Sequence, residues 1–251
     1  MVGGCGAPPV IVLVPEGGVV ADQLLQLPTD EAHHLRVRRA EPGEHVELRD
    51  GAGLVGDAVL LESTARHALI RVTASRTVEP PAPLALFVAA GDKDRFGWLV
   101  EKAGELGVTR LVPVETERTI GVSTRVGTPH LARLRRRALD AIKQSGAAWA
   151  PAISGVTSLA AALAEETRGE AGGTARWLAD AAGEWPPAAL RPAPAAVLIG
   201  PEGGLTSRER EMAVTSGWEP VRLGAAVLRF ETAALAAAVA VGIARGRGAD
   251  D

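Results

Sequence analysis

The sequence contains little of several residue types that would define a class of protein. Its 251 residues include a single cysteine, Cys5, which excludes an internal disulfide framework and a zinc site built from cysteines. The apolar runs at residues 10–14 and 233–244 are too short to cross a membrane, and no basic segment precedes the first one. We therefore expect a cytoplasmic protein with a reduced thiol and with no membrane or metal partner.

An excess of positive charge is also missing. The chain has 27 Lys and Arg residues against 30 Asp and Glu residues, a net charge of −3, so the total charge does not indicate a nucleic-acid-binding protein. The basic residues are nevertheless clustered, and most of them are arginines, as at residues 36–39 and 133–137. The planar guanidinium of arginine suits phosphates and base edges. A coding bias toward arginine is the competing explanation.

Residues 1–78 have the pattern of a small β-barrel. Short apolar runs separated by turns with Gly and Pro predict strands at residues 10–14, 45–48, 54–61 and 68–73. A helix at residues 29–39, with Thr29 as its N-cap, is expected to interrupt them. The prolines at residues 79–83 then predict a domain boundary, because proline breaks a strand ladder.

Residues 79–251 have the pattern of an α/β domain. Apolar runs predict buried strands of a mainly parallel sheet at residues 84–89, 110–114, 152–156, 176–179, 195–199 and 220–223. Amphipathic helices are predicted at residues 96–106 and 129–145, and Gly107 is placed to end the first of them.

A glycine-rich loop follows the strand at residues 195–199. It reads Leu198-Ile199-Gly200-Pro201-Glu202-Gly203-Gly204, and Thr206 with Glu209 fits a capping box for the next helix. Glycines let the backbone approach a flat ligand, and ligands of α/β folds bind at the carboxyl ends of strands. The loop is neither a Walker A loop nor a Gly-x-Gly-x-x-Gly fingerprint. Its spacing alone is equally compatible with a ligand site and with a turn that binds nothing.

A second loop follows residues 220–223 and precedes an alanine-rich helix. It reads Leu223-Gly224-Ala225-Ala226-Val227-Leu228-Arg229-Phe230-Glu231-Thr232. Glu231 and Thr232 suit a helix N-terminus, which favours carboxylates and hydroxyls. Arg229 does not, because the helix dipole disfavours a cation there. An unfavourably placed charge of this kind indicates a functional residue.

These two loops resemble the SPOUT methyltransferases and, in detail, the family of 16S rRNA N3-uridine methyltransferases. In that family a Gly-Pro-Glu-Gly-Gly loop and a Leu-Gly-x-x-x-Leu-Arg-x-Glu-Thr-Ala segment form the cofactor pocket. Further similar segments occur in the family's order: Gly91-Asp92-Lys93 with residues 101–108, Glu117-Arg118-Thr119, Gln144-Ser145-Gly146, and residues 33–43. Lys143 and Ala147 depart from the pattern, which usually has Glu and often has Arg at these positions.

The resemblance implies a PUA-like N-terminal barrel followed in the sequence by a trefoil-knot α/β domain. Such a knot is an exception to the rule that protein chains are not knotted. It also implies a homodimer, 16S rRNA of the small ribosomal subunit as the substrate, and S-adenosyl-L-methionine (SAM) as the cofactor. The loop after Leu178 is expected to form a third wall of the SAM pocket. The predicted cofactor-binding residues are Leu178, Leu198, Ile199, Gly200, Pro201, Glu202, Gly203, Gly204, Leu223, Gly224, Val227, Leu228, Arg229 and Thr232.

Arg229 and Glu231 are the predicted catalytic residues. The N3 proton of uridine is lost only at alkaline pH, so a guanidinium beside the ring oxygens would stabilise the anion, by about 3 kcal/mol for one well-placed donor. Glu231 or Glu202 is either the general base or an anchor for Arg229 or for the loop. The motifs contain no histidine, which argues against a histidine base.

RNA-binding residues are predicted in both domains. They are Arg36, Arg38 and Arg39 in the barrel, assigned to rRNA phosphates, and Lys93 and Arg118 in the α/β domain. The arginines at residues 133–137 form a solvent-exposed face, a second RNA patch or part of a dimer surface. His33 and His34 have no third ligand at a suitable spacing, so a metal site is not expected.

Other functions remain open on the sequence alone. One is a SPOUT enzyme that methylates another RNA target, such as a ribose 2′-hydroxyl or a tRNA base. Another is a catalytically silent RNA-binding protein that retains the pocket. A nucleotide-dependent small-molecule enzyme would need a phosphate loop, which the motifs do not contain.

Overall fold

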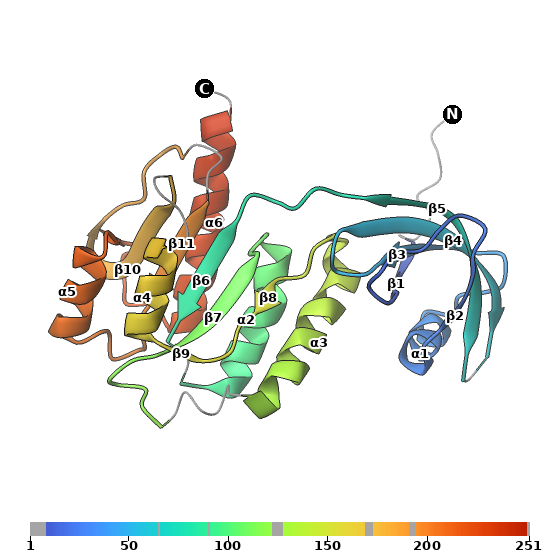
Figure 1. Ribbon diagram of the computed structural model, residues 1–251, viewed down its shortest axis with the longest axis horizontal. Helices are drawn as coiled ribbons and strands as arrows, with labels where there is room; N and C mark the ends of the chain where they lie inside the picture. Colours follow the sequence, from blue (N-terminus) through green and yellow to red (C-terminus); the bar gives the residue numbers. More distant parts are fainter. Residues whose placement is uncertain are drawn as a thin grey trace. The chain divides into compact units, whose positions relative to one another are not determined.

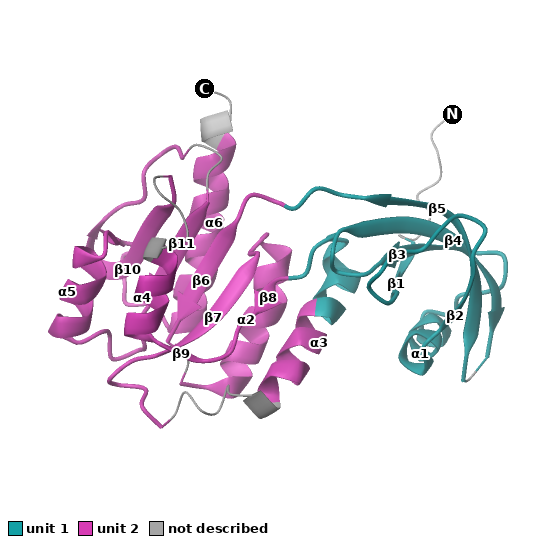
Figure 2. Ribbon diagram, in the orientation of Figure 1, with its two compact units in different colours: residues 1–80, 139–150 teal, residues 81–138, 151–251 magenta. Residues whose placement is uncertain are grey.

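The computed structural model describes residues 9–64, 66–89, 91–121, 128–168, 173–190 and 194–249. The chain forms two compact units, residues 1–80 with 139–150 and residues 81–138 with 151–251 (Figure 2). The units thus differ from the predicted domains, 1–78 and 79–251, in that the first unit also takes in residues 139–150. That each domain has its own function stays a prediction.

The first unit is a curled five-stranded sheet with a helix of its own (Figure 1), and residues 139–145, at the end of a helix shared with the second unit, also belong to it. The β1–β3 pair is parallel and the other pairs are antiparallel. The helix α1 (Thr29–Val37) packs against β1, β4 and β5, and buries Leu35 with Leu48, Leu60 and Ile70 in one apolar core. The strands, in their order across the sheet, are β1 (Val10–Leu13), β3 (His45–Arg49), β4 (Leu54–Ser63), β5 (Ala68–Thr77) and β2 (Leu24–Leu27).

Three details of this unit correct the prediction. Thr29 is not the N-cap of α1: Pro28 holds that position, and its carbonyl accepts from the Glu31 and Ala32 amides, so no side chain caps the helix. The helix also ends at Val37 rather than at Arg39, which has a φ of 57°. The edge strand β2 was missed because four residues are too few to show a period.

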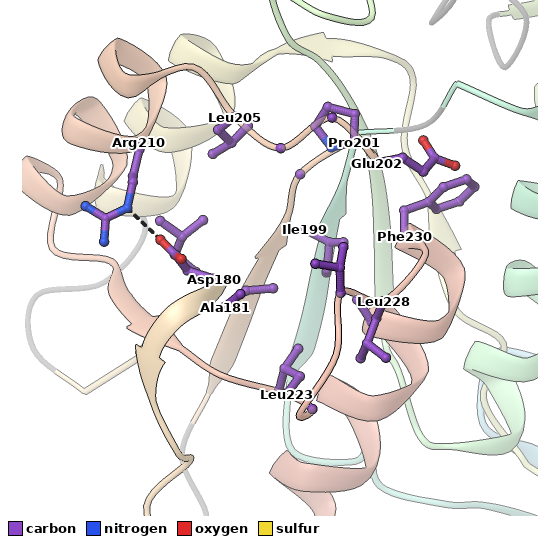
Figure 3. A pocket seen from close by; sticks show the side chains of 18 of the residues that line it. Asp180, Ala181, Ile199, Pro201, Glu202, Leu205, Arg210, Leu223, Leu228 and Phe230 are labelled. Atoms are coloured by element: carbon purple, nitrogen blue, oxygen red, sulfur yellow. Dashed lines mark hydrogen bonds and ion pairs between the residues drawn. The ribbon is translucent and has the colours of Figure 1, made fainter.

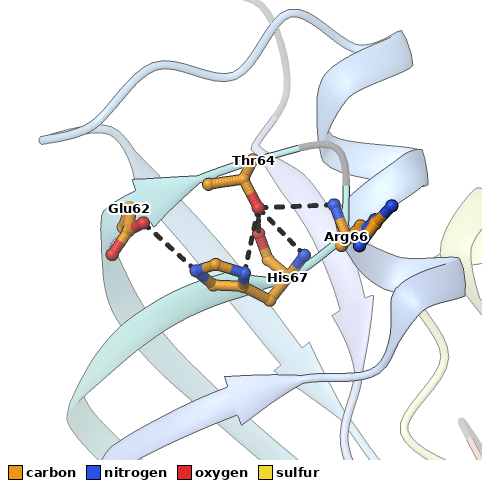
Figure 4. Close-up of polar contacts among 4 residues, drawn as sticks. All are labelled: Glu62, Thr64, Arg66 and His67. Atoms are coloured by element: carbon orange, nitrogen blue, oxygen red, sulfur yellow. Dashed lines mark hydrogen bonds and ion pairs between the residues drawn. The ribbon is translucent and has the colours of Figure 1, made fainter.

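The turn between β4 and β5 is fixed by the hydroxyl of Thr64 (Figure 4). Its oxygen accepts from the amide of His67 at 3.1 Å and donates to the carbonyl of the same residue at 2.9 Å. The ring nitrogen Nε2 of His67 lies 3.1 Å from Oε1 of Glu62. These contacts close the hairpin that joins the two longest strands of the sheet.

Residues 139–150 complete the first unit. Lys143 Nζ lies 2.5 Å from Oε1 of Glu31, whose side chain is 2% exposed, and Oε2 of Glu31 accepts from the Leu13 amide at 3.1 Å. Trp149 Nε1 donates to the Val78 carbonyl at 3.0 Å. Lys143, which departs from the pattern of the family described above, therefore supplies the cation that pairs with a buried carboxylate.

The second unit is a parallel sheet between two layers of helices (Figure 1). Its strands, in order, are β12 (Glu219–Val221), β10 (Ala175–Glu184), β11 (Ala195–Ile199), β6 (Leu84–Val88), β7 (Arg110–Glu115) and β8 (Ala152–Ile153), and β9 (Thr157–Ser158) pairs with β7. The helices are α2 (Lys93–Glu105), α3 (Thr128–Ser145), α4 (Leu159–Arg168), α5 (Ser207–Thr215) and α6 (Phe230–Ala249). Among the described residues, no helix is long and apolar enough to span a membrane.

Alternating side chains of the sheet form two apolar cores. Leu86 and Val197 pack on the face covered by α2, α3 and α6, whereas Phe87 and Leu198 pack on the face covered by α4 and α5. Both faces are buried, which explains the continuous apolar runs by which the strands were predicted.

Several elements of this unit differ from the prediction, and the strand expected at residues 152–156 ends at Ile153. Helix α2 begins at Lys93 rather than at residue 96, because the Asp92 carboxylate caps it by accepting from the Asp94 and Arg95 amides at 2.9 and 3.0 Å. Strand β10 extends to Glu184 rather than ending at residue 179. The helix α4 was missed, although Ser158 accepts from the Ala161 amide at its start.

The buried pair of Glu31 and Lys143 predicts a local loss of stability. Lys143→Ala leaves a buried carboxylate without this cation and should destabilise the first unit by about 3 kcal/mol. Hydrogen exchange of the β3, β4 and β5 amides should become faster. The double variant Glu31→Gln with Lys143→Ala should recover most of the protection, and Lys102→Ala, at an exposed pair, is the matched control. Unchanged exchange in Lys143→Ala would contradict this.

Candidate functional site

A cavity of about 410 Å³ opens at the carboxyl edge of the parallel sheet (Figure 3). Because β10 lies between β11 and β12 and all three run parallel, the segments that follow them meet at one edge. The lining residues are Leu178, Ala179, Asp180, Ala181, Ile199, Gly200, Pro201, Glu202, Gly203, Gly204, Leu205, Arg210, Leu223, Gly224, Ala226, Val227, Leu228, Phe230 and Ala233. The volume is typical of a site for a cofactor-sized molecule.

The wall after Leu178 is a strand and not the predicted loop. Its pairing with β12 shifts register between Ala179 and Glu184, and Ala179, Asp180 and Ala181 at the start of this irregular stretch line the cavity. Gly183 lies so close to the Pro220 backbone that a Cβ there would clash with it. The irregular end of β10 thus brings two strand ends together.

The glycine-rich loop is rigidly anchored. The Pro201 carbonyl accepts from the Gly204 amide at 2.7 Å, and Gly204 has a φ of 72°, a conformation that favours glycine. The predicted capping box of Thr206 and Glu209 is present at the start of α5. The second oxygen of Glu209 accepts from the Glu117 amide at 2.8 Å. This anchoring leaves backbone groups of residues 200–204 facing the cavity with few side chains in the way.

One side of the cavity carries an ion pair. Arg210 Nε, from α5, lies 2.5 Å from Oδ2 of Asp180 (Figure 3). Burial alone would raise the pKa of Asp180, but hydrogen bonds from the Ala182 amide and from Arg210 hold this pKa below its usual value. The carboxylate is therefore ionised at neutral pH.

Arg95 links two carboxylates beside the cavity. From α2, its Nη1 donates to Oε1 of Glu202 at 3.3 Å, and its Nε lies 4.0 Å from Oε1 of Glu231. Glu202 belongs to the glycine-rich loop, and Glu231, 8% exposed, lies in the first turn of α6. Arg95 therefore connects the two loops that the sequence singled out.

Most predicted cofactor-binding residues line the cavity, and the exceptions are Leu198, Arg229 and Thr232. Leu198 lies in a strand interior and points to the α4 and α5 layer, away from its neighbours Val197 and Ile199. Arg229 directly precedes α6 and is exposed, and Thr232 is exposed on its first turn.

The predicted RNA-binding residues fall into both units. Arg118 Nη1 donates to the Gly204 carbonyl at 3.2 Å, so it lies on the glycine-rich loop. Lys93 is exposed at the start of α2. Arg36, Arg38 and Arg39 are exposed in the first unit. No group of three His, Cys, Asp or Glu residues that suits a metal ion is found in the described part of the chain.

Sequence reasoning missed three charged residues around the cavity: Arg95, Asp180 and Arg210. The signals were weak but present. Arg95 follows the Gly91-Asp92-Lys93 segment by two residues, and Arg210 lies four residues after the predicted cap Thr206, one turn into α5. Asp180 follows a buried strand, where polar side chains of α/β proteins gather.

Solved structures show the class of the protein. Ribosomal RNA small subunit methyltransferase E from Neisseria gonorrhoeae, bound to S-adenosyl methionine, has a TM-score of 0.81 and 28% identity, covering 93% of this chain and 96% of that chain. A methyltransferase from Legionella pneumophila in complex with SAM has a TM-score of 0.80 and 25% identity, covering 93% and 96%. The second unit is thus a SPOUT-type trefoil-knot methyltransferase domain, as expected.

Sequence comparison gives the family. Residues 78–242 match the RNA methyltransferase domain, and residues 27–73 match the RNA methyltransferase PUA domain. Ribosomal RNA small subunit methyltransferase E of Mycobacterium tuberculosis is 32% identical over 244 residues, 93% of this chain and 90% of that protein. The chain belongs to the ribosomal RNA small subunit methyltransferase E family of RNA methyltransferases, which confirms the resemblance.

The pair of Asp180 and Arg210 predicts a measurable titration. Arg210→Gln removes a hydrogen bond and a positive charge, so the pKa of Asp180 should rise. Carbon-13 NMR of the labelled carboxyl follows this titration directly. Arg208→Gln, which removes an exposed charge from the same helix, should leave the pKa of Asp180 where it is. An unchanged pKa in Arg210→Gln would show that Arg210 does not hold the carboxylate.

Proposed function

We propose that this chain transfers a methyl group from S-adenosyl-L-methionine to N3 of a uridine in 16S rRNA of the small ribosomal subunit. The observation that carries the proposal is the cavity at the sheet edge, with the exposed Arg229 and the buried Glu231 beside it. Relatives named as small-subunit rRNA methyltransferases support the substrate. Two similar structures that hold SAM support the cofactor.

The residues of the cavity fit this cofactor. SAM, when bound, supplies an electrophilic methyl group on a sulfonium sulfur. The open backbone of Gly200, Gly203 and Gly204 suits the flat adenine and its polar edge. Leu223 and Leu228 provide apolar contact on the other loop, and Asp180 and Arg210 provide charges of both signs for a ligand that itself carries an ammonium and a carboxylate.

Arg229 is the proposed stabiliser of the uridine anion. It is exposed just before α6, and no ion pair joins it to any described residue, so its charge is available to an incoming base. A guanidinium directed at the ring oxygens favours the deprotonated N3, which is the nucleophile. The unfavourable position at a helix N-terminus is then explained by the reaction.

The two carboxylates near Arg95 have different surroundings. Glu202 lines the cavity, whereas Glu231 does not and is nearly buried. This difference supports Glu202 as the group that accepts the N3 proton, and Glu231 as the group that holds Arg95 against the loop. Glu231 would then act on catalysis through Arg95 and Glu202, and not as the base.

We further propose that the protein works as a homodimer in the cytoplasm and binds rRNA phosphates through Arg36, Arg38, Arg39, Lys93 and Arg118. The exposed side chains of Val239 and Ile243 lie one turn apart on α6, and they would be buried by a second copy. The exposed arginines of the first unit suit phosphate contacts.

Methyl transfer from labelled SAM to small ribosomal subunits that lack the modification tests the function. We expect 3-methyluridine on nucleoside mass analysis of the extracted 16S rRNA. Another methylated nucleoside, or label in tRNA, would retain the enzyme class and overturn the substrate. SAM binding without transfer to any RNA would indicate a silent RNA-binding protein.

Arg229→Ala tests the proposed mechanism. Turnover should fall by about 100-fold or more, since a preorganised donor to the developing anion is lost. The Kd for SAM, measured by calorimetry, should stay within a few-fold, because Arg229 does not line the cavity. Arg208→Ala, another exposed arginine of this unit, is the control and should keep full turnover. Full turnover in Arg229→Ala would remove Arg229 from the mechanism.

A further inference from the structure

A group of basic side chains lies outside the cavity, around a small hollow between α2 and α3. Lys93 lines it from the first turn of α2, and His130, Arg133 and Arg137 line it from α3, together with Asp94 and Leu134. All of these residues belong to the second unit. We refer to Lys93, His130, Arg133 and Arg137 as the α2–α3 basic cluster.

The members of this cluster differ in how their charges are balanced. Arg137 Nε forms an ion pair with Oε1 of Glu101 at 2.8 Å, and its guanidinium packs against Gly97 so closely that a Cβ there would clash. Arg137 is therefore held in place and largely neutralised. In the described part of the chain, no ion pair joins Lys93 or Arg133 to a carboxylate, and Arg133 is exposed. With Asp94 as the acid that lines the hollow, the cluster keeps a positive charge.

The first turn of α2 lies between this cluster and the cavity. Lys93 faces the hollow, and Arg95, two residues further along, donates to Glu202 of the cavity loop. Helices α2 and α3 follow β6 and β7, whose carboxyl ends lie at the same edge of the sheet as that of β11, because these three strands are parallel neighbours. The cluster and the cavity therefore flank one helical turn at the same edge of the sheet.

We infer that the α2–α3 basic cluster binds a backbone phosphate of the RNA next to the uridine whose base enters the cavity. This inference rests on the proposed function and deepens it. Arg133 supplies a planar fork that can bind two phosphate oxygens, and Lys93 supplies a mobile point charge. Phosphate contacts fix the register of the RNA and carry no sequence information. The cluster thus acts on positioning of the target nucleotide and not on the choice of base.

The test compares single variants of the full-length protein. Lys93→Gln and Arg133→Gln each remove one charge of the cluster, and Lys102→Gln removes the same charge from the far end of α2 as the matched control. The probe is unmodified 16S rRNA made by transcription, titrated at several KCl concentrations. Loss of one phosphate contact should reduce the slope of log affinity against log salt by about 0.7 to 0.9. The Kd for SAM should not change in any variant.

The outcomes separate this inference from the proposed function. A reduced salt slope and a raised KM for RNA in Lys93→Gln and Arg133→Gln, with the control unchanged, would support the cluster. Wild-type affinity and slope in both variants, in a protein that still methylates rRNA, would overturn the inference alone. Loss of dimer in sedimentation with unchanged RNA affinity would overturn it in favour of a dimer surface. Failure of the wild-type protein to methylate small ribosomal subunits that lack the modification would overturn the proposed function itself.

Discussion

The position of β10 between β11 and β12 is the constraint on which the site depends. Parallel pairing on both sides of β10 brings the ends of β10, β11 and β12 to one edge of the sheet. In the sequence, 45 residues lie between Ala175, where β10 begins, and Val221, where β12 ends. The irregular end of β10 and the close approach at Gly183 then narrow the space between those ends. This pairing places the strand ends that line the cavity and the loops that follow them, in which the catalytic candidates Arg229 and Glu202 lie.

The polar groups around the cavity are held from outside it. Arg95 comes from α2, which contributes no residue to the lining of the cavity. Its guanidinium contacts Glu202 in the glycine-rich loop and Glu231 in the first turn of α6. Glu209 caps α5 and also accepts from the Glu117 amide, which joins the segment after β7 to the same loop. A loop rich in glycine is flexible by itself, so these external contacts are what give it one conformation.

The sequence predicts the β-barrel pattern of the first domain, the α/β pattern of the second, the buried strands and both cavity loops. These features depend on local periodicity and on glycine. It does not predict β2, whose short edge strand has too few residues for a period, or the start of α2, where the cap Asp92 lies outside the apolar pattern. Arg95, Asp180 and Arg210 were missed for a different reason. Their roles depend on partners 107 and 30 residues away, and the weak local signals at these positions do not identify those partners. The knot also depends on segments that are distant in sequence, and it was expected from the family resemblance alone.

The first unit is discontinuous, and this sets an order for folding during synthesis. Its sheet is made from residues before 81, but Lys143 and Trp149 arrive only after the intervening residues 81–138 have been translated. At about 5 to 20 residues per second, the N-terminal sheet waits several seconds with Glu31 lacking this cation. A ribosome-bound chain that pauses in this interval carries an incomplete first unit, so it reaches its mature form only after much of the methyltransferase unit has also emerged.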